Sequence, residues 1–168
     1  MASHNGNLIM LTFNKVPSSN KLVIGCGSGH THPGGHLGCD TMDISSEMEP
    51  DILGDITKTC RMHMEMFERY QFILCEGLPG KIYREPFFYE NLDFFCKKNG
   101  LIIFSPIISS SIALLANYAS LYPWRLNIMD LSNRYLLSPF EYDEYFRLVN
   151  DLYFKYGSKG SISYIATK

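Results

Sequence analysis

Short apolar runs that end at a glycine or a polar residue are the feature that most limits how this chain can fold. Five such runs occur, at residues 22–24, 37–44, 52–53, 72–75 and 101–104. They stop, in order, at Gly25, at Asp43-Ile44, at Gly54-Asp55, at Glu76-Gly77 and at Ser105-Pro106. Strands that are buried on both faces of a sheet read as continuous apolar runs of this kind. The pattern therefore predicts five buried strands.

Helical patterns lie between several of these runs. The spacing of apolar residues predicts helices over residues 57–70, 86–98, 109–121 and 138–153, with Asn99-Gly100 as the C-terminal cap of the second. Two further strands are expected at residues 125–129 and 161–167. Strands that alternate with helices predict an open α/β sheet with helices on both faces. A length of 168 residues fits one domain, which we place at residues 21–168 after an N-terminal extension over residues 1–20.

Composition narrows the class of protein. Fifteen basic residues against 17 acidic ones give no basic excess, which disfavours an electrostatic nucleic-acid binder. The five cysteines are scattered and no signal peptide precedes them, so we expect a reduced, cytoplasmic protein. Residues 101–124 carry no charge, but Pro106 and Asn117 interrupt them, and no membrane segment is expected.

The most informative segment is Lys21-Leu-Val-Ile-Gly-Cys-Gly-Ser-Gly29. Three alternate glycines directly after a buried strand permit a sharp turn and a close approach of the backbone to a ligand. A dinucleotide-binding fingerprint would place its third glycine at position 30, where this chain has His30. This difference argues against a nicotinamide or flavin enzyme.

Two carboxylates follow at the ends of the next two expected strands. Asp43 ends the second strand and Asp55 follows the third. A carboxylate at the first place can accept hydrogen bonds from both ribose hydroxyls, and one at the second place can reach an adenine amino group. Because the carboxyl ends of parallel strands border the ligand in such sheets, the glycine loop and these carboxylates form a nucleoside-shaped set.

Five segments in this order resemble the class I S-adenosylmethionine-dependent methyltransferases. They are Ile24-Gly-Cys-Gly-Ser-Gly29, Met42-Asp-Ile-Ser45, Asp51-Ile-Leu-Gly-Asp-Ile56, Tyr70-Gln-Phe-Ile-Leu-Cys75 and Asn99-Gly-Leu-Ile-Ile-Phe104. The resemblance implies a Rossmann-like, doubly wound, mostly parallel sheet of seven strands with an antiparallel strand near the C-terminus. It also implies that residues 21–168 bind S-adenosylmethionine as cofactor.

The resemblance implies a role for each matching residue. Cofactor contacts are expected from Gly25, Cys26, Gly27, Ser28, Gly29, Asp43, Ile44, Asp55, Ile56 and Cys75. The glycines would line the methionine part, Asp43 would hold the ribose and Asp55 would meet adenine. Glu76, at the end of the fourth strand, is the candidate catalytic residue, as a general base for the methyl acceptor.

The chain also departs from the family pattern. Val23 stands where many relatives have an acidic residue, and the stretch between Gly29 and Cys39 is too short for a full first helix. Only about twenty residues precede the first strand, and Cys75-Glu-Gly-Leu-Pro79 differs from the Asn-Pro-Pro-Tyr type of motif. Three functions stay open: a methyltransferase with an open or partner-completed site, a silent interaction or regulatory subunit of this fold, and another reaction on the same cofactor.

The expected partner is a methyl acceptor, a small molecule or protein rather than a nucleic acid, with a protein partner or a homo-oligomer also possible. Potential metal ligands crowd one loop, namely Cys26, His30, His32, His36 and Cys39. Their spacing matches no usual zinc pattern, and we expect no metal site.

Overall fold

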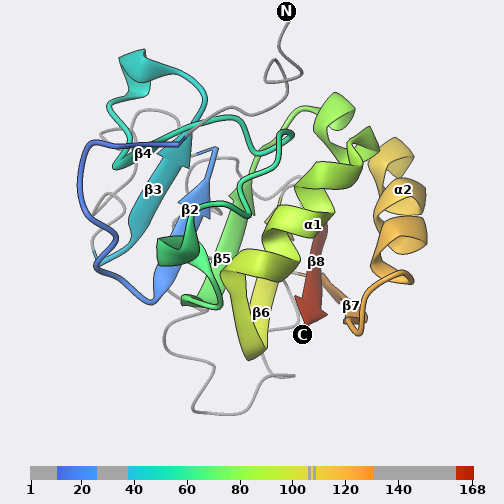
Figure 1. Cartoon of the computed structure of the whole chain (residues 1–168). Coiled ribbons are helices and arrows are strands. Elements are labelled where there is room, and N and C mark those ends of the chain that lie inside the picture. Colours follow the sequence, from blue (N-terminus) through green and yellow to red (C-terminus); the bar gives the residue numbers. More distant parts are fainter. Residues whose placement is uncertain (1–10, 26–37, 106, 108, 131–161) are drawn as a thin grey trace, which may run out of the picture.

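An eight-stranded mixed sheet forms the centre of the molecule (Figure 1). The computed structural model describes residues 11–25, 38–105, 107, 109–130 and 162–168. The strands are β1 Thr12–Phe13, β2 Lys21–Ile24, β3 Asp40–Asp43, β4 Ile52–Leu53, β5 Tyr70–Glu76, β6 Cys96–Ser105, β7 Arg125–Asp130 and β8 Ile162–Thr167. They lie in the order β1-β4-β3-β2-β5-β6-β8-β7.

The direction of the strands confirms the predicted fold class. Strands β2 to β6 run parallel to one another, and β8 lies antiparallel between β6 and β7. The sheet is therefore mostly parallel, with the expected antiparallel strand near the C-terminus. The chain order reverses between β2 and β5, and this reversal is the switch point at which ligands bind in open α/β sheets.

One strand more than the seven expected is present among the described residues. Strand β1 pairs antiparallel with the outer edge of β4, with Thr12 opposite Leu53 and Phe13 opposite Ile52. Part of the predicted N-terminal extension thus belongs to the sheet. The apolar run Leu8-Ile-Met-Leu11 stands directly before this strand, but the sequence analysis assigned it to the N-terminal extension.

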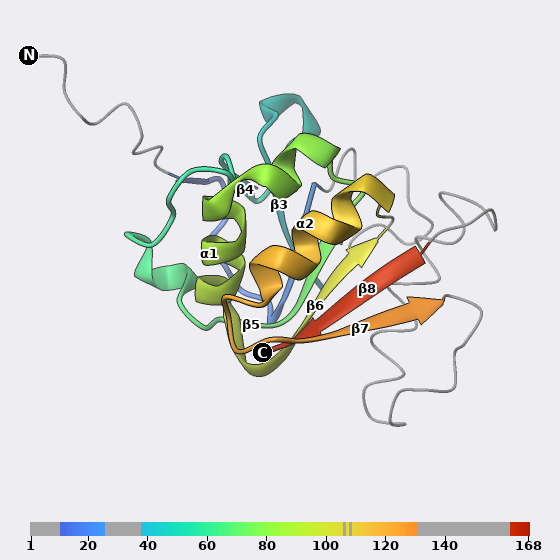
Figure 2. The same ribbon diagram turned by 90° about the vertical axis from the view of Figure 1, so that its right-hand side faces the viewer.

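Two α-helices, α1 Pro86–Phe95 and α2 Ser109–Ala119, lie on the same face of the sheet (Figure 2). Proline at the first position and buried Phe88, Leu92 and Phe95 explain why α1 begins and packs as it does. Short 3-10 helices are η3 Ser46–Met48, η4 Met64–Met66 and η5 Gly80–Arg84. The helix predicted over residues 138–153 lies outside the described residues.

The helix predicted over residues 57–70 is wrong. This segment consists of turns and η4, and Tyr70 is already the first residue of β5. Its apolar residues do not share a face, because Met66 and Tyr70 are buried whereas Met62 and Phe67 are exposed. Several backbone amides of the segment close local turns instead, and the Cys60 amide donates to a side chain of α1.

The prediction that Asn99-Gly100 caps the C-terminus of the helix over residues 86–98 is also wrong. Helix α1 ends at Phe95, and the chain enters β6 at Cys96. Asn99 has φ 65° inside β6, where the pairing with β5 shifts register. A Cβ on Gly100 would lie 2.8 Å from the Lys97 carbonyl oxygen, so the backbone is close-packed here. Asn99 and Gly100 therefore lie at an irregularity within β6 and not at a helix end.

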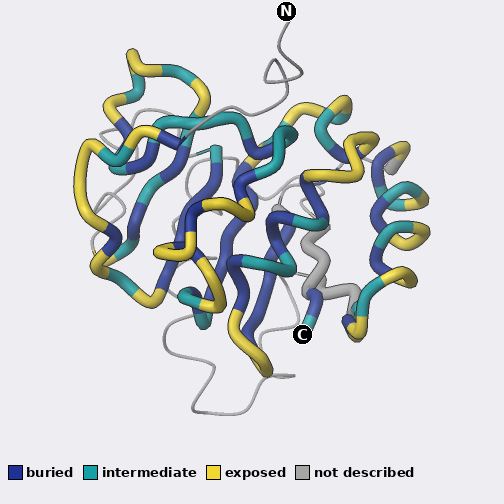
Figure 3. The backbone as a smooth tube through the Cα atoms, viewed as in Figure 1, coloured by how far each residue is buried: buried dark blue, intermediate teal, exposed yellow. Residues whose placement is uncertain are grey.

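The core lies between the sheet and the two helices, and Figure 3 shows buried residues running along the central strands. Strand β2 is buried along its whole length and β5 at all but one position, as continuous apolar runs require. Within the described part of the chain, no helix has the length and hydropathy needed to cross a membrane.

Candidate cofactor site

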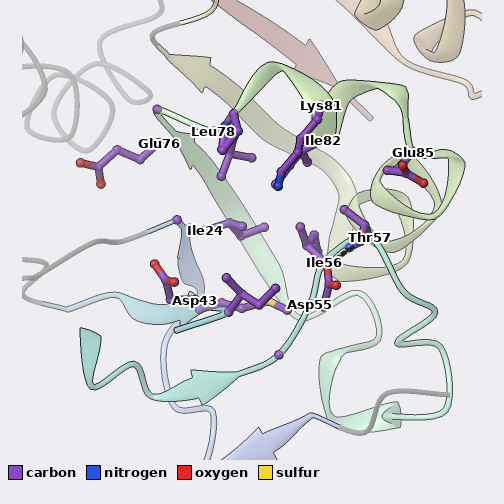
Figure 4. A pocket seen from close by; sticks show the side chains of 16 residues that line it. Ile24, Asp43, Asp55, Ile56, Thr57, Glu76, Leu78, Lys81, Ile82 and Glu85 are labelled. Atoms are coloured by element: carbon purple, nitrogen blue, oxygen red, sulfur yellow. Dashed lines mark hydrogen bonds between the residues drawn. The ribbon is translucent and has the colours of Figure 1, made fainter. Parts of the chain in front are cut away.

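A cavity of about 550 Å³ lies at the carboxyl ends of β2, β3, β4 and β5. Its size is within the range of small-molecule sites, and it stands at the switch point of the sheet. The lining residues are Ile24, Gly25, Met42, Asp43, Ile44, Gly54, Asp55, Ile56, Thr57, Glu76, Gly77, Leu78, Pro79, Lys81, Ile82 and Glu85. Figure 4 shows η5 on one side of the cavity, with Asp43 and Asp55 on the opposite side.

Gly25 forms the turn that ends β2 beneath the cavity. Its φ is 74°, and its amide donates a 2.9 Å hydrogen bond to the Met42 carbonyl oxygen. A Cβ at this position would lie 2.9 Å from the Glu76 carbonyl oxygen and 2.5 Å from Leu78 Cδ2. Glycine is therefore required here by both conformation and space. The rest of the predicted loop, Cys26, Gly27, Ser28 and Gly29, lies outside the described residues.

Asp43 ends β3 and lines the cavity as the sequence pattern predicts. Its Oδ1 accepts a 2.9 Å hydrogen bond from the Ser45 amide, which fixes the orientation of the carboxylate. The next residue, Ile44, is 67% exposed although it is apolar, and it lines the same cavity. The exposed Ile44 side chain can pack against a flat apolar group of a ligand, and the neighbouring Asp43 carboxylate can accept hydrogen bonds from its hydroxyl groups.

Asp55 follows β4 and lies on the same side of the cavity. Its Oδ1 accepts hydrogen bonds from the amide and the hydroxyl of Thr57, at 2.9 and 2.6 Å. Ile56 lines the cavity and is at the same time part of the buried core. The two expected carboxylates and their apolar neighbours thus border one space.

Glu76 and Cys75 end β5 and differ in where they lie. Glu76 lines the cavity and is only 2% exposed. Cys75 lies one residue earlier, is fully buried in the core and is not among the residues that line the cavity. Burial raises the pKa of the Cys75 thiol well above its ordinary value. The structure therefore brings Glu76 to the cavity and leaves Cys75 behind it.

The segment after β5 supplies lining residues that the sequence analysis missed. They are Leu78, Pro79, Lys81, Ile82 and Glu85, in and around η5. In Figure 4 the side chain of Lys81 extends from η5 into the cavity, above Ile24 and Ile56. The available signal was positional, since every loop that leaves the carboxyl end of a strand near the switch point borders the ligand space.

Four of the five grouped potential metal ligands lie outside the described residues, which include only Cys39. Cys39 precedes β3, so it lies at the strand's amino end, whereas the cavity is at the carboxyl ends. Among the residues that the structure describes, no three histidine, cysteine, aspartate or glutamate side chains gather closely enough to hold a metal ion.

Solved structures that are similar to this chain include methyltransferases and a cyclase. A SAM-dependent methyltransferase from Archaeoglobus fulgidus is 11% identical with a TM-score of 0.50, over 91% of this chain and 88% of that one. A ribosomal protein L11 methylase from Lactobacillus delbrueckii subsp. bulgaricus is 13% identical with a TM-score of 0.51, over 88% and 68%. The [4+2]-cyclase SpnF is 10% identical with a TM-score of 0.51, over 90% and 75%.

The described part of the chain therefore has the fold of the class I S-adenosylmethionine-dependent methyltransferases. No protein-family model matches the sequence, and no curated protein sequence matches it significantly. The likeness establishes the fold alone, and the activity has to be argued from the cavity.

Proposed function

We propose that this chain binds S-adenosylmethionine in the cavity and transfers its methyl group to an acceptor. The observation that carries the proposal is that Asp43 and Asp55, from the ends of adjacent strands, line one cavity with the Gly25 turn at the switch point. In this assignment Asp43 accepts hydrogen bonds from the ribose hydroxyls and Asp55 accepts one from the adenine amino group. Each charge-assisted bond contributes roughly 1.5–3 kcal/mol.

The residues present fit this cofactor. Apolar Ile24, Ile44, Ile56 and Leu78 offer surfaces for a purine ring, and the two carboxylates match the donors that a nucleoside carries. The backbone of Gly25 itself lines the cavity. In this proposal, the part of the site that binds the methionine portion of the cofactor is completed by Cys26, Gly27, Ser28 and Gly29.

Glu76 is the proposed general base. When bound, the cofactor supplies an electrophilic methyl group on a sulfonium. Transfer of this group to an acceptor oxygen or nitrogen would break its bond to sulfur, and the Glu76 carboxylate would take the proton that the acceptor atom loses. The remaining contribution of the protein is to hold the reacting atoms in line.

We propose a small molecule or a protein as the methyl acceptor, because the chain has no excess of basic residues of the kind that nucleic-acid binding favours. A partner protein or a second copy of the chain would complete the open side of the cavity, where Ile44 is exposed. A cytoplasmic location fits the four described cysteines, which are all free thiols.

Thermal unfolding with and without ligand tests the proposal. S-adenosylmethionine or S-adenosylhomocysteine at a hundredfold excess over its dissociation constant should stabilise the protein by about 2.7 kcal/mol. For a domain of this size that is a rise of roughly 5–11 °C in Tm. A rise with both compounds and none with NAD or ATP supports the cofactor site. No rise with either would favour a silent subunit of this fold.

A reaction other than methyl transfer is the second candidate, because the [4+2]-cyclase SpnF shares this fold. Product analysis separates the two. Formation of S-adenosylhomocysteine together with a methylated acceptor supports the transferase, whereas turnover of an acceptor without loss of the cofactor's methyl group supports the other reaction.

A further inference from the structure

A fully buried asparagine of α1 holds the loop that carries Asp55. The Asn91 side chain is 0% exposed, and its Nδ2 donates to the Ile56 carbonyl oxygen at 2.8 Å and to the Lys58 carbonyl oxygen at 2.6 Å. Its Oδ1 accepts a 3.0 Å hydrogen bond from the Cys60 amide. Two carbonyl oxygens need donors and one amide needs an acceptor, so only the amide side chain in this orientation satisfies all three.

These three bonds all reach one short stretch of chain, more than thirty residues away in sequence. The same stretch begins with the residues that line the cavity, namely Asp55, Ile56 and Thr57. Within it, the Thr57 amide and hydroxyl orient the Asp55 carboxylate, and the Lys58 amide donates to the Asp55 carbonyl oxygen at 3.1 Å. Asn91 therefore holds the backbone of residues 56–60, and this backbone carries the groups that orient the Asp55 carboxylate.

Helix α1, which carries Asn91, is itself packed firmly in the core. Phe88, Leu92 and Phe95 bury one side of it in the core. On the same helix, Asp93 accepts a 2.9 Å hydrogen bond from Trp124 Nε1, which ties α1 to the segment before β7. The loop has no helix or long strand of its own between β4 and η4, so its position depends on such contacts.

We infer that Asn91 is a positioning residue for recognition of the adenine base. It acts through Asp55, by holding residues 56–60 so that the Asp55 carboxylate meets the amino group of the base. This inference rests on the proposed function, since it needs an adenosyl ligand in the cavity. Asn91 itself is not among the residues that line the cavity.

The test compares S-adenosylhomocysteine with S-inosylhomocysteine, in which an oxo group replaces the amino group of the base. Isothermal titration calorimetry gives Kd for both compounds with the wild type and the variants Asn91→Leu, Asp55→Ala and the double variant. We expect the wild type to prefer the adenosyl compound at least tenfold. Asn91→Leu should lower this preference at least fivefold and should add almost nothing in the Asp55→Ala background, because both changes remove the same contact.

Asp93→Ala is the matched control. It breaks a hydrogen bond of the same helix that does not involve the loop, so it should lower Tm and leave the preference unchanged. An Asn91→Leu variant that weakens both compounds equally, or whose effect adds to that of Asp55→Ala, would overturn the inference and leave the proposed function standing. Failure of the wild type to bind either compound would remove the proposed function and the inference with it.

A milder variant and a measurement on the wild type serve if Asn91→Leu does not fold. Asn91→Ser should lower the preference in the same direction. In the wild type, hydrogen exchange at the Cys60 amide, which donates to Asn91, should slow at least threefold when S-adenosylhomocysteine binds. Exchange at Cys60 that is unchanged by the ligand would contradict the inference.

Discussion

The same local device holds both carboxylates of the cavity. In each case Oδ1 accepts a hydrogen bond from the backbone amide two residues later, from Ser45 to Asp43 and from Thr57 to Asp55, both at 2.9 Å. Such Asx turns are built from neighbouring residues and need no distant ion pair. These turns set the orientation of each carboxylate relative to its own backbone, so one oxygen of each is fixed before a ligand arrives.

Replacing Asp43 by alanine should weaken S-adenosylmethionine binding at least tenfold, about 1.4 kcal/mol or more, because the acceptor for the ribose hydroxyls is lost. Calorimetric titration measures the effect. Glu47→Ala is the matched control, since Glu47 lies in the nearby η3 and is exposed. Unchanged affinity in a folded Asp43→Ala protein would remove Asp43 from the site.

Glu76→Gln should leave cofactor affinity nearly unchanged and lower kcat at least tenfold, because the amide keeps the size of the side chain but cannot accept the acceptor's proton. Turnover with the identified acceptor and Kd from titration measure the two quantities separately. Equal turnover in the variant would show that Glu76 only borders the cavity.

At the scale of elements, β1 is secured by a histidine from the segment before η4. His63 is buried, its Nε2 accepts a 3.0 Å hydrogen bond from the Leu11 amide, and its ring meets Phe13 edge-on at 5.4 Å. Leu11 in turn packs where a side chain on Gly54 would stand, directly behind the cavity wall. The attachment of β1 therefore also supports the end of β4.

His63→Leu should lower the free energy of unfolding by about 1–3 kcal/mol, because the buried Leu11 amide loses its acceptor. Urea unfolding followed by circular dichroism measures the change. Val16→Ala is the control in the same stretch, since Val16 is exposed and its truncation should change stability by less than about 0.5 kcal/mol. Equal stability of His63→Leu and the wild type would show that β1 does not depend on this contact.

The strands could be predicted from the sequence better than the segments between them. Buried strands such as β2 and β5 have a continuous apolar signature. The segment over residues 57–70 has helical spacing but forms local turns, and the amides of Cys60 and Glu68 donate to groups of α1. A hydrogen bond from Asn91 to a loop more than thirty residues away leaves no trace in local periodicity. Local periodicity therefore predicted a helix over residues 57–70 where contacts with α1 stabilise a loop.

At the scale of the whole molecule, the site was predictable where it depends on strand ends. Asp43, Asp55 and Glu76 each follow a recognisable strand, and the parallel sheet brings these ends together. The η5 side was not predictable, because Lys81 and Ile82 reach the cavity only through the path that the chain takes after β5. Glu76 lines the cavity and Cys75 does not, because successive residues of a strand point to opposite sides of the sheet.

Buried ionisable groups also give the whole molecule a defined response to alkaline pH. Burial raises the pKa of the Cys60 and Cys96 thiols to about 12, from an ordinary value of 9.0. Asp55 adds to the rise in pKa at Cys60, whereas Lys168 opposes it at Cys96. Burial likewise raises the pKa of Tyr70 and Tyr83. The folded chain therefore keeps protons that the unfolded chain has already lost.

The free energy of unfolding should accordingly fall as pH rises from about 9 towards 12, each such thiol contributing a slope of up to about 1.4 kcal/mol per pH unit. Guanidinium unfolding at pH 8, 9.5 and 11 measures the slope. In the Cys60→Ala variant, the free energy of unfolding should fall less steeply with pH, because the contribution of one buried thiol is removed. Stability that stays level or increases over this range would contradict the assignment of buried thiols.

The pairing of β1 with β4 also bears on how separate molecules meet. An uncovered strand edge presents a row of backbone groups that can pair with the edge of another chain, and this is a common start of aggregation. Strand β1 occupies the outer edge of β4, and two residues are too short a template for a second chain to extend. In the described part of the chain, β1 therefore covers the edge of β4 that would otherwise be open to such pairing.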